Sequence, residues 1–219
     1  MAMKTSISSN SSTGAGSWPT LAALLAVCAI GMLALYRATM GFEVVSTEDG
    51  RRLAFSRAPM QLPVTAIHAP QAAELSQLLR DDGRVTIMTF FYSSCNALCS
   101  VLGDEFQQLQ AAIHARGLER QVRLLSISFD PRDDAAMLAA YARRQHADPS
   151  VWQMVSIDSA PQRKALLDQL GIVVLPAPLG EFQHNAALHL IDRHGRLVLI
   201  DDYENPALAL EHAIRRSGP

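Results

Sequence analysis

Two cysteines at a spacing that suits metal or redox chemistry are the most reactive feature of the sequence. Cys95 and Cys99 are four residues apart, and on a helix this spacing places both side chains on one face, roughly 5–6 Å apart at Cβ. In the first turn of a helix, unpaired backbone N–H groups and the helix dipole favour the thiolate form. Two such thiolates can close a disulfide or bind a soft metal ion such as Cu(I) or zinc. The spacing alone leaves both chemistries open.

The stretch before the cysteines predicts a central β-strand. Residues 85–92 are apolar, β-branched or aromatic, with Thr as the only polar type, which is typical of a strand buried on both faces in a mostly parallel sheet. Ser93 and Ser94 follow, and a helical pattern begins at Asn96. The cysteine pair therefore falls where a central strand turns into a helix, a position at which α/β folds place ligand chemistry.

A metal ion held by two cysteines needs a third ligand, and histidine is the candidate type. His184 lies just before the last predicted hairpin, in a proline-containing loop that we expect to be free to move. His189 lies within a predicted strand, where a buried and satisfied histidine is the ordinary case. Three histidines lie on or just after predicted helices, where solvation is the simplest interpretation: His114, His146 and His212. His194 lies in a hairpin turn and His68 in the connector.

The order of strand and helix patterns predicts an α/β domain over residues 71–219. The expected elements after the first strand are a helix at 96–115, a strand at 122–129, a helix from 130–134 to 144, a strand at 152–157, a helix capped by Ser159 and ending at 170, an apolar run at 172–175 broken by Pro176 and Pro178, a hairpin at 187–192 and 197–201, and a helix at 207–216 capped by Asn205. This order is that of a thioredoxin-like fold, with a central mixed sheet flanked by helices.

The N-terminal part predicts a membrane anchor. Residues 1–17 are rich in Ser, Thr, Gly and Asn, and we expect them to be disordered. Residues 18–36 carry no charge and have Trp18 and Tyr36 at their ends, which fits one transmembrane helix with interfacial aromatic residues. A cleaved signal peptide is the alternative, although the run is longer than usual and no clear cleavage site follows it. Cys28 lies inside this run and is interpreted as a bystander.

The remaining features limit the function classes. Residues 37–70 are predicted to form a connector with a hairpin, strands 43–46 and 52–55 flanking a turn at 48–50, and residues 71–79 a short helix. The formal net charge is −2 and 18% of residues are charged, without the basic patch that nucleic-acid binding needs. Three cysteines are too few for a disulfide scaffold. Basic residues on the two sides of the predicted span nearly balance, so charge does not fix its orientation.

Three segments resemble the SCO/SenC family. They read FFYSSCNALC, SISFDPRDD and HNAALHLIDRHG, and they stand in the family's order within residues 85–201. The resemblance implies a membrane-anchored, thioredoxin-like copper chaperone for cytochrome c oxidase assembly, in which Cys95, Cys99 and His184 bind copper. It also implies a domain on the periplasmic side, or in an equivalent exported compartment. The implied partners are the copper-bearing oxidase subunit and other copper carriers or thiol reductases.

The sequence departs from the family pattern around the cysteines. Asn96 and Ser100 stand where the family commonly has proline, and Gln183 replaces an acidic residue that often precedes the histidine. Loss of two prolines predicts a more flexible metal loop. An enzyme remains the rival interpretation: a thiol–disulfide oxidoreductase with Cys95 as nucleophile and Cys99 as resolving thiol, or a redox sensor built on the same pair.

Overall fold

The structure is a computed structural model that describes residues 17–39, 50, 52, 54–55, 57–69, 72–81, 83–94 and 98–218, without the side chains of residues 17 and 98–101. The chain divides into two compact units, Met1–Gly50 and Arg51–Pro219. Each unit is described by itself. The finer boundaries predicted at residues 17, 36 and 70 stay predictions.

The N-terminal unit contains one long apolar helix, α1 (Ser17–Ala38). Its stretch Trp18–Ala38 has a mean hydropathy of 2.1 over its most apolar window, and none of that window is buried. Twenty or so apolar residues in helical form are enough to cross the hydrocarbon core of a bilayer. The structure therefore confirms the predicted apolar helix, whose composition would also suit a signal sequence.

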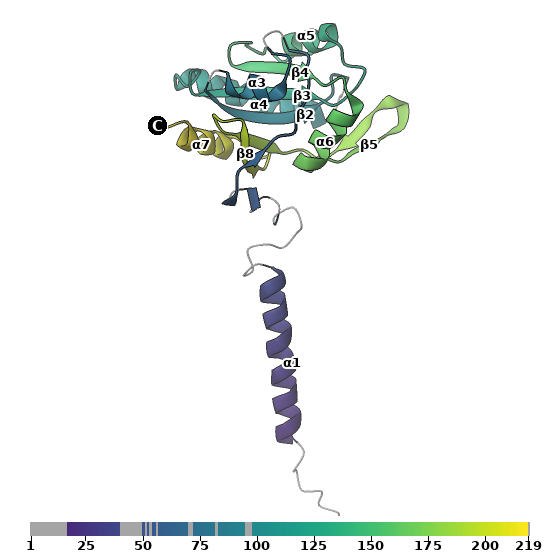
Figure 1. Cartoon of the computed structure of the whole chain (residues 1–219), viewed down its shortest axis with the longest axis vertical. Helices are drawn as coiled ribbons and strands as arrows, with labels where there is room; N and C mark the ends of the chain where they lie inside the picture. The colour runs from purple at the N-terminus through teal and green to yellow at the C-terminus, as the bar shows by residue number, and fades with distance from the viewer. Residues whose placement is uncertain are drawn as a thin grey trace, which may run out of the picture. The chain divides into compact units, whose positions relative to one another are not determined.

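The second unit is built on a mixed β-sheet with β2 at its interior. Among the described residues the sheet has six strands in the order β1-β8-β7-β2-β3-β4. Its strands β2, β3 and β4 lie side by side in Figure 1. β2, β3 and β4 are parallel, and the other neighbours pair antiparallel. The strand bounds are Met60–Gln61 (β1), Val85–Phe91 (β2), Val122–Ser128 (β3), Trp152–Ser156 (β4), Leu188–Ile191 (β7) and Arg196–Asp201 (β8). Every residue of β2 is buried, as the apolar run predicts.

Helices cover both faces of this sheet, which is why the apolar stretch is buried on both sides. The helix bounds are Leu75–Arg80 (α3), Leu98–Ala115 (α4), Ala135–Arg144 (α5), Ala160–Leu170 (α6) and Pro206–Ser217 (α7). Ile87 of β2 belongs to the core beneath α4 and α7, whereas its neighbour Met88 belongs to the core beneath α3, α5 and α6. Successive strand residues point to opposite faces, so one strand supplies both cores. The thioredoxin-like arrangement predicted from the order of elements is confirmed.

The helix ends follow their local sequence signals. Ser159 caps α6 by accepting a hydrogen bond from the Gln162 backbone N–H, and the helix stops at Gly171 in the left-handed conformation (φ 68°). Asn205 caps α7 in the same way through the Leu208 N–H. Side-chain oxygens at these positions satisfy backbone donors that have no partner inside the helix. Both caps agree with the predicted helix starts.

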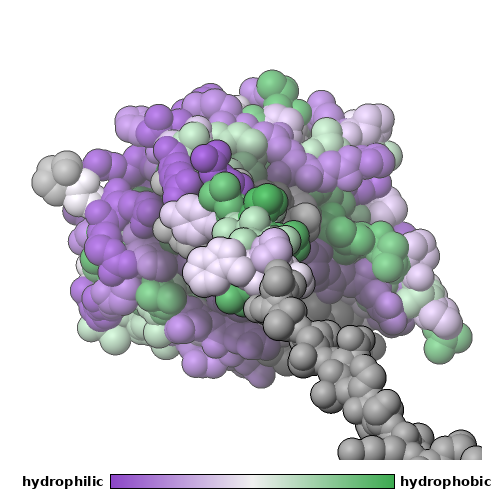
Figure 2. Space-filling model, turned by 90° about the horizontal axis from the view of Figure 1, so that it is seen from below, coloured by the Kyte–Doolittle hydropathy of each residue, from purple (hydrophilic) through white to green (hydrophobic). Residues whose placement is uncertain are grey.

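A short two-stranded sheet differs from the prediction. β5 (Val174–Pro176) and β6 (Phe182–His184) pair antiparallel and are joined through the 3₁₀ turn η1 (Pro178–Gly180). We call this segment, residues 174–184, the arm. We expected the residues before the last hairpin to form a free loop, and the arm shows that His184 instead ends a strand. The surface seen in Figure 2 is largely hydrophilic, with hydrophobic residues at the outer end of the arm.

The connector also differs from the prediction. Residues 52, 54, 55 and 57 are helical, and the Ala58 N–H donates to the Ala54 carbonyl at 2.9 Å, so the predicted second hairpin strand is wrong. Arg and Ala favour a helical turn, which outweighed the turn signal before them. The first strand, at 43–46, lies outside the described residues. Helix α3 begins later than expected because the backbone of Glu74 forms a bridge with Ala66.

Candidate metal site

The structure describes the three predicted ligands to different extents. Cys95 lies outside the described residues, as does Asn96. The backbone of Cys99 lies in the first turn of α4, the position at which the helix dipole favours a thiolate. His184 is fully described, as the half-buried last residue of β6. Two described elements lead into the predicted metal site: β2, which precedes the cysteines, and β6, which ends at His184.

His184 lies beside the end of β2. Its ring makes edge contacts with the rings of Phe129, at 4.9 Å between centroids, and Tyr92, at 6.2 Å. Tyr92 is the residue directly after β2 and precedes Cys95 by three positions. The fold thus brings the predicted histidine to the strand end from which the chain continues to the cysteines.

The hydrogen bonding of His184 assigns its tautomer. Nδ1 lies 3.0 Å from the backbone carbonyl oxygen of Asn185. A carbonyl can only accept, so in the neutral imidazole this contact places the proton on Nδ1 and leaves the lone pair on Nε2. An imidazole oriented in this way by a carbonyl is the usual state of a metal-ligating histidine. The ring therefore fits the role of a ligand through Nε2.

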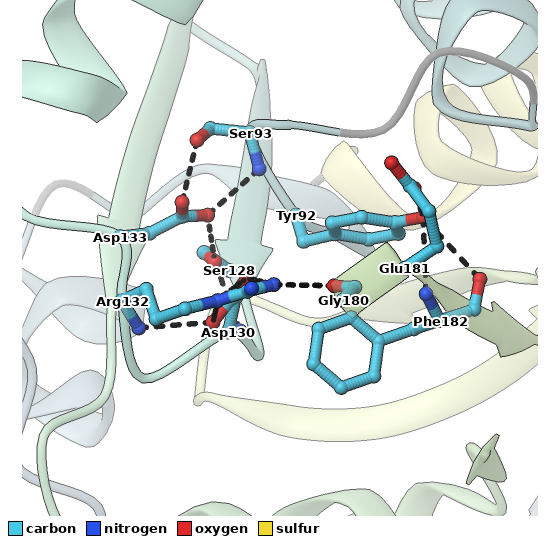
Figure 3. A network of polar contacts seen from close by, with 9 residues as sticks. All are labelled: Tyr92, Ser93, Ser128, Asp130, Arg132, Asp133, Gly180, Glu181 and Phe182. Carbon is cyan, nitrogen blue, oxygen red and sulfur yellow. Dashed lines mark hydrogen bonds and ion pairs between the residues drawn. The ribbon is translucent and has the colours of Figure 1, made fainter. Parts of the chain in front are cut away.

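A buried carboxylate fixes the chain just before the cysteines. Asp133, 5% exposed, accepts hydrogen bonds from the Ser93 N–H (2.7 Å), the Ser93 hydroxyl (2.5 Å) and the Ser128 hydroxyl (2.5 Å) (Figure 3). The Ser93 carbonyl accepts from Arg144 Nη2 at 2.8 Å. All three polar groups of Ser93 are therefore bound by two side chains. This arrangement fixes the backbone two residues before Cys95.

The neighbouring Arg132 joins this loop to the arm. Its guanidinium donates to the Asp130 carboxylate through Nε, at 2.9 Å from each oxygen, and through Nη2, at 2.6 Å. Nη2 also donates to the Gly180 carbonyl at 2.8 Å (Figure 3), and the guanidinium lies over the Phe182 ring, 5.3 Å from its centroid. The hydrogen bonds and the charge of Asp130 raise the pKa of Arg132 above its usual value. Arg132 is therefore a permanent cation between the two segments.

The other predicted candidate, His189, is a core residue. It is fully buried in β7, with Nε2 3.4 Å from the Leu170 carbonyl and an edge contact to Phe90 at 5.8 Å. His212 was interpreted as solvated, but it is partly buried and its Nδ1 lies 2.7 Å from Asp201 Oδ2. Among the residues that the structure describes, no three or more His, Cys, Asp or Glu side chains form a group that could hold a metal ion.

Sequence reasoning missed Tyr92, Ser93, Arg132 and Asp133 as residues of the site. The available signal was the Asp-Pro-Arg-Asp segment directly after a buried strand, at the same edge of the sheet as the cysteines. The same segment belongs to the family resemblance, which assigns its side chains no role. Asp133 is 40 positions from its partner Ser93 along the chain, and Arg132 is 48 positions from its partner Gly180.

Comparison with known proteins gives one family. The model of the SCO1/SenC family matches residues 79–217. A search of curated proteins gives no match.

Solved structures of similar fold include Sco family proteins. BsSco has a disulfide switch and is a member of the Sco family of cytochrome c oxidase assembly proteins. It aligns with a TM-score of 0.61 and 17% sequence identity, and the alignment covers 73% of this chain and 95% of BsSco. A SCO1/SenC family lipoprotein from Bacillus anthracis aligns with a TM-score of 0.59 and 20% sequence identity, over 72% of this chain and 98% of its own. Yeast Sco1, solved with copper bound, aligns with a TM-score of 0.57 and 18% sequence identity, over 74% of this chain and 92% of its own.

Proposed function

This chain belongs to the SCO1/SenC family, and on that premise we propose that it is a membrane-anchored copper chaperone for cytochrome c oxidase. Its cargo is Cu(I), delivered to the dinuclear copper centre of the copper-bearing oxidase subunit. Two findings about relatives support this function: yeast Sco1 has been solved with copper bound, and BsSco belongs to the oxidase assembly proteins. Other copper carriers or thiol reductases are the proposed upstream partners.

The proposed ligands are Cys95, Cys99 and His184. The observation that carries this assignment is the position of His184 beside the end of β2, with Nε2 holding the lone pair. Soft thiolates select Cu(I), and an imidazole completes a three-coordinate set. A low coordination number leaves one side of the ion open, so an incoming thiolate of a partner can replace these ligands one at a time. Asn96 and Ser100 lie within the same loop and are expected to leave it more flexible than a proline-containing one.

Copper titration of the full-length reduced chain in detergent tests the proposal. We expect one Cu(I) per chain, measured by competition with a chromophoric Cu(I) chelator. His184→Ala is expected to weaken binding by about 100-fold or more, because loss of a residue that only supports a ligand already weakens binding about 10- to 100-fold. His194→Ala, an exposed histidine in the β7–β8 turn, is the matched control and keeps wild-type affinity. A wild-type chain that binds no Cu(I), or a His184→Ala variant that binds normally, contradicts the proposal.

A thiol–disulfide oxidoreductase or redox sensor is the second candidate, favoured by the disulfide switch of BsSco. In this reaction the Cys95 thiolate attacks a partner disulfide and releases one partner thiolate. Cys99 then attacks the mixed disulfide, so that the partner leaves as a dithiol and this chain becomes oxidised. The reaction does not use His184. Intact dithiol exchange with lost copper binding in His184→Ala supports the chaperone, whereas full biological rescue by that variant supports the reductase.

We also propose that the domain faces an exported compartment, with residues 18–36 as its single membrane span. The apolar helix α1 supports the anchor, and a lipoprotein among the relatives supports membrane association. A reporter that is active only after export, fused after residue 60, tests the sidedness. Activity of a cytoplasm-specific reporter at the same junction would contradict the oxidase role.

A further inference from the structure

We propose that Tyr92 and Arg132 are positioning residues for His184. They hold the arm against the end of β2 from two sides, and so fix the histidine relative to the cysteine pair. This inference rests on the proposed copper site and assigns to it two residues that do not contact the metal.

Tyr92 forms the first attachment. Its side chain is 2% exposed, and its hydroxyl donates to Glu181 Oε2 at 2.6 Å while accepting from the Phe182 N–H at 3.3 Å. Its ring also contacts the rings of Phe182, at 5.2 Å between centroids, and His184, at 6.2 Å. One side chain thus contacts three residues of the arm. Because Tyr92 is followed within three positions by Cys95, the attachment links the two ligand-bearing segments directly.

Arg132 forms the second attachment, which starts from the loop after β3. The Asp130 carboxylate that orients it is 1% exposed, so the guanidinium is anchored to the core by charge-assisted hydrogen bonds, the stronger class of such bonds. From this anchor Nη2 donates to the Gly180 carbonyl at 2.8 Å, and the cation stacks on the Phe182 ring at 5.3 Å. Arg132 and Tyr92 therefore both contact Phe182, and they bind the two residues before it, Gly180 and Glu181 respectively.

The arm needs such attachments because its own pairing is weak. It has three residues in each strand and forms a separate two-stranded sheet that is not paired with the main one. An isolated two-stranded hairpin is marginal in water. Phe182 and Val174 pack against the core, but apolar packing does not define orientation as hydrogen bonds do. If the arm is already fixed before copper binds, binding does not have to order it, and less conformational entropy is lost.

Tyr92→Phe and Arg132→Gln test the inference in the full-length chain. Tyr92→Phe removes only the hydroxyl and leaves the Asp130–Arg132 pair intact, which guards against a general loss of folding. Each variant is expected to weaken Cu(I) binding about tenfold, the lower end of the range for residues that support a ligand. Tyr203→Phe and Arg116→Gln are the matched controls, because each also interacts with a glutamate outside the arm. Both controls keep wild-type affinity.

A double-mutant cycle with His184→Ala separates positioning from a merely structural effect. If the two residues act through His184, neither substitution weakens Cu(I) binding further once the histidine is gone. Losses that simply add in the double variants overturn the inference. So does unchanged affinity in both single variants.

Hydrogen exchange in the metal-free chain supplies a readout that does not depend on copper. Exchange of the Phe182 amide is expected to rise about tenfold in Tyr92→Phe and Arg132→Gln, with no change in the amides of β2. If the wild-type chain binds no Cu(I), the proposed function fails, and this measurement alone decides whether the two residues hold the arm. Unchanged exchange in both variants shows that they do not.

Discussion

Asp133 shows at the scale of single residues how a buried charge defines a local conformation. A carboxylate removed from water is tolerated only when its oxygens accept hydrogen bonds. Here the donors are the Ser93 N–H, the Ser93 hydroxyl and the Ser128 hydroxyl. These groups come from the ends of adjacent parallel strands. The hydrogen bonds to the carboxylate therefore also fix the path of the chain after β2. The cysteine loop therefore starts from a defined backbone position.

Replacement of Asp133 by alanine is expected to lower the free energy of unfolding by about 3 kcal/mol, because hydrogen bonds to a buried charged group are lost and their donors stay buried. Urea denaturation followed by circular dichroism measures the change. Asp134→Ala is the matched control: the adjacent aspartate only caps α5 through the Met137 N–H, and loss of such a cap lowers stability by about 1 kcal/mol. Equal losses in the two variants would contradict the special role of Asp133.

This network marks a limit of sequence reasoning. Periodicity and capping signals act between residues a few positions apart, so they predicted β2 and the starts of α6 and α7. Ser93 and Asp133 are 40 positions apart, and no local rule selects one carboxylate of the Asp-Pro-Arg-Asp segment over another. Only the register of β2 against β3, with Phe91 opposite Ser128, brings the two together.

At the scale of elements, the arm was missed for a related reason. Pro176 and Pro178 were interpreted as breakers of an apolar run, yet proline is compatible with an edge strand because no donor is needed on the solvent side. Three-residue strands also carry too little alternation to be recognised. His184 was a candidate ligand from its position before the last hairpin, and the family resemblance selected it. Its place on a strand that packs against Tyr92 and Phe129 became visible only in the structure.

The turn of the arm contains a strained residue. Leu179 has φ 63°, in the left-handed region that disfavours residues with a Cβ, and its side chain is fully exposed. Leu179→Gly is therefore expected to raise the free energy of unfolding by about 0.5–1 kcal/mol, since relief of the strain exceeds the entropy that glycine gains in the unfolded chain. Leu175→Gly, at a position in β5 that is 55% exposed and has no positive φ, is the control and should lower the free energy of unfolding. Thermal denaturation of both variants measures the two changes, and destabilisation by Leu179→Gly would contradict the strain argument.

At the scale of the whole molecule, long and strongly patterned segments carried the prediction of the fold. The order of strands and helices was enough to predict a thioredoxin-like domain, because parallel strands need crossover helices that cover both faces of the sheet. The prediction for the connector was wrong at residues 52–55, because short segments of mixed propensity favour helix and strand almost equally. The apolar helix α1 was predicted from composition alone, since its length and lack of charge within residues 18–36 need no tertiary context.

Membrane insertion of α1 can be tested by a charge at its centre. An arginine in the middle of a transmembrane helix is unfavourable by about 3 kcal/mol, so Val27→Arg is expected to lower the equilibrium constant for insertion about 100-fold. Thr20→Arg, near the start of the same helix, is the matched control, because a long basic side chain near an end can extend to the interface. Carbonate extraction of membranes followed by mass measurement of the retained chain distinguishes the alternatives. A retained full-length chain that is lost only in Val27→Arg establishes an anchor, whereas a wild-type chain recovered in soluble form with its first residues removed establishes a cleaved signal peptide.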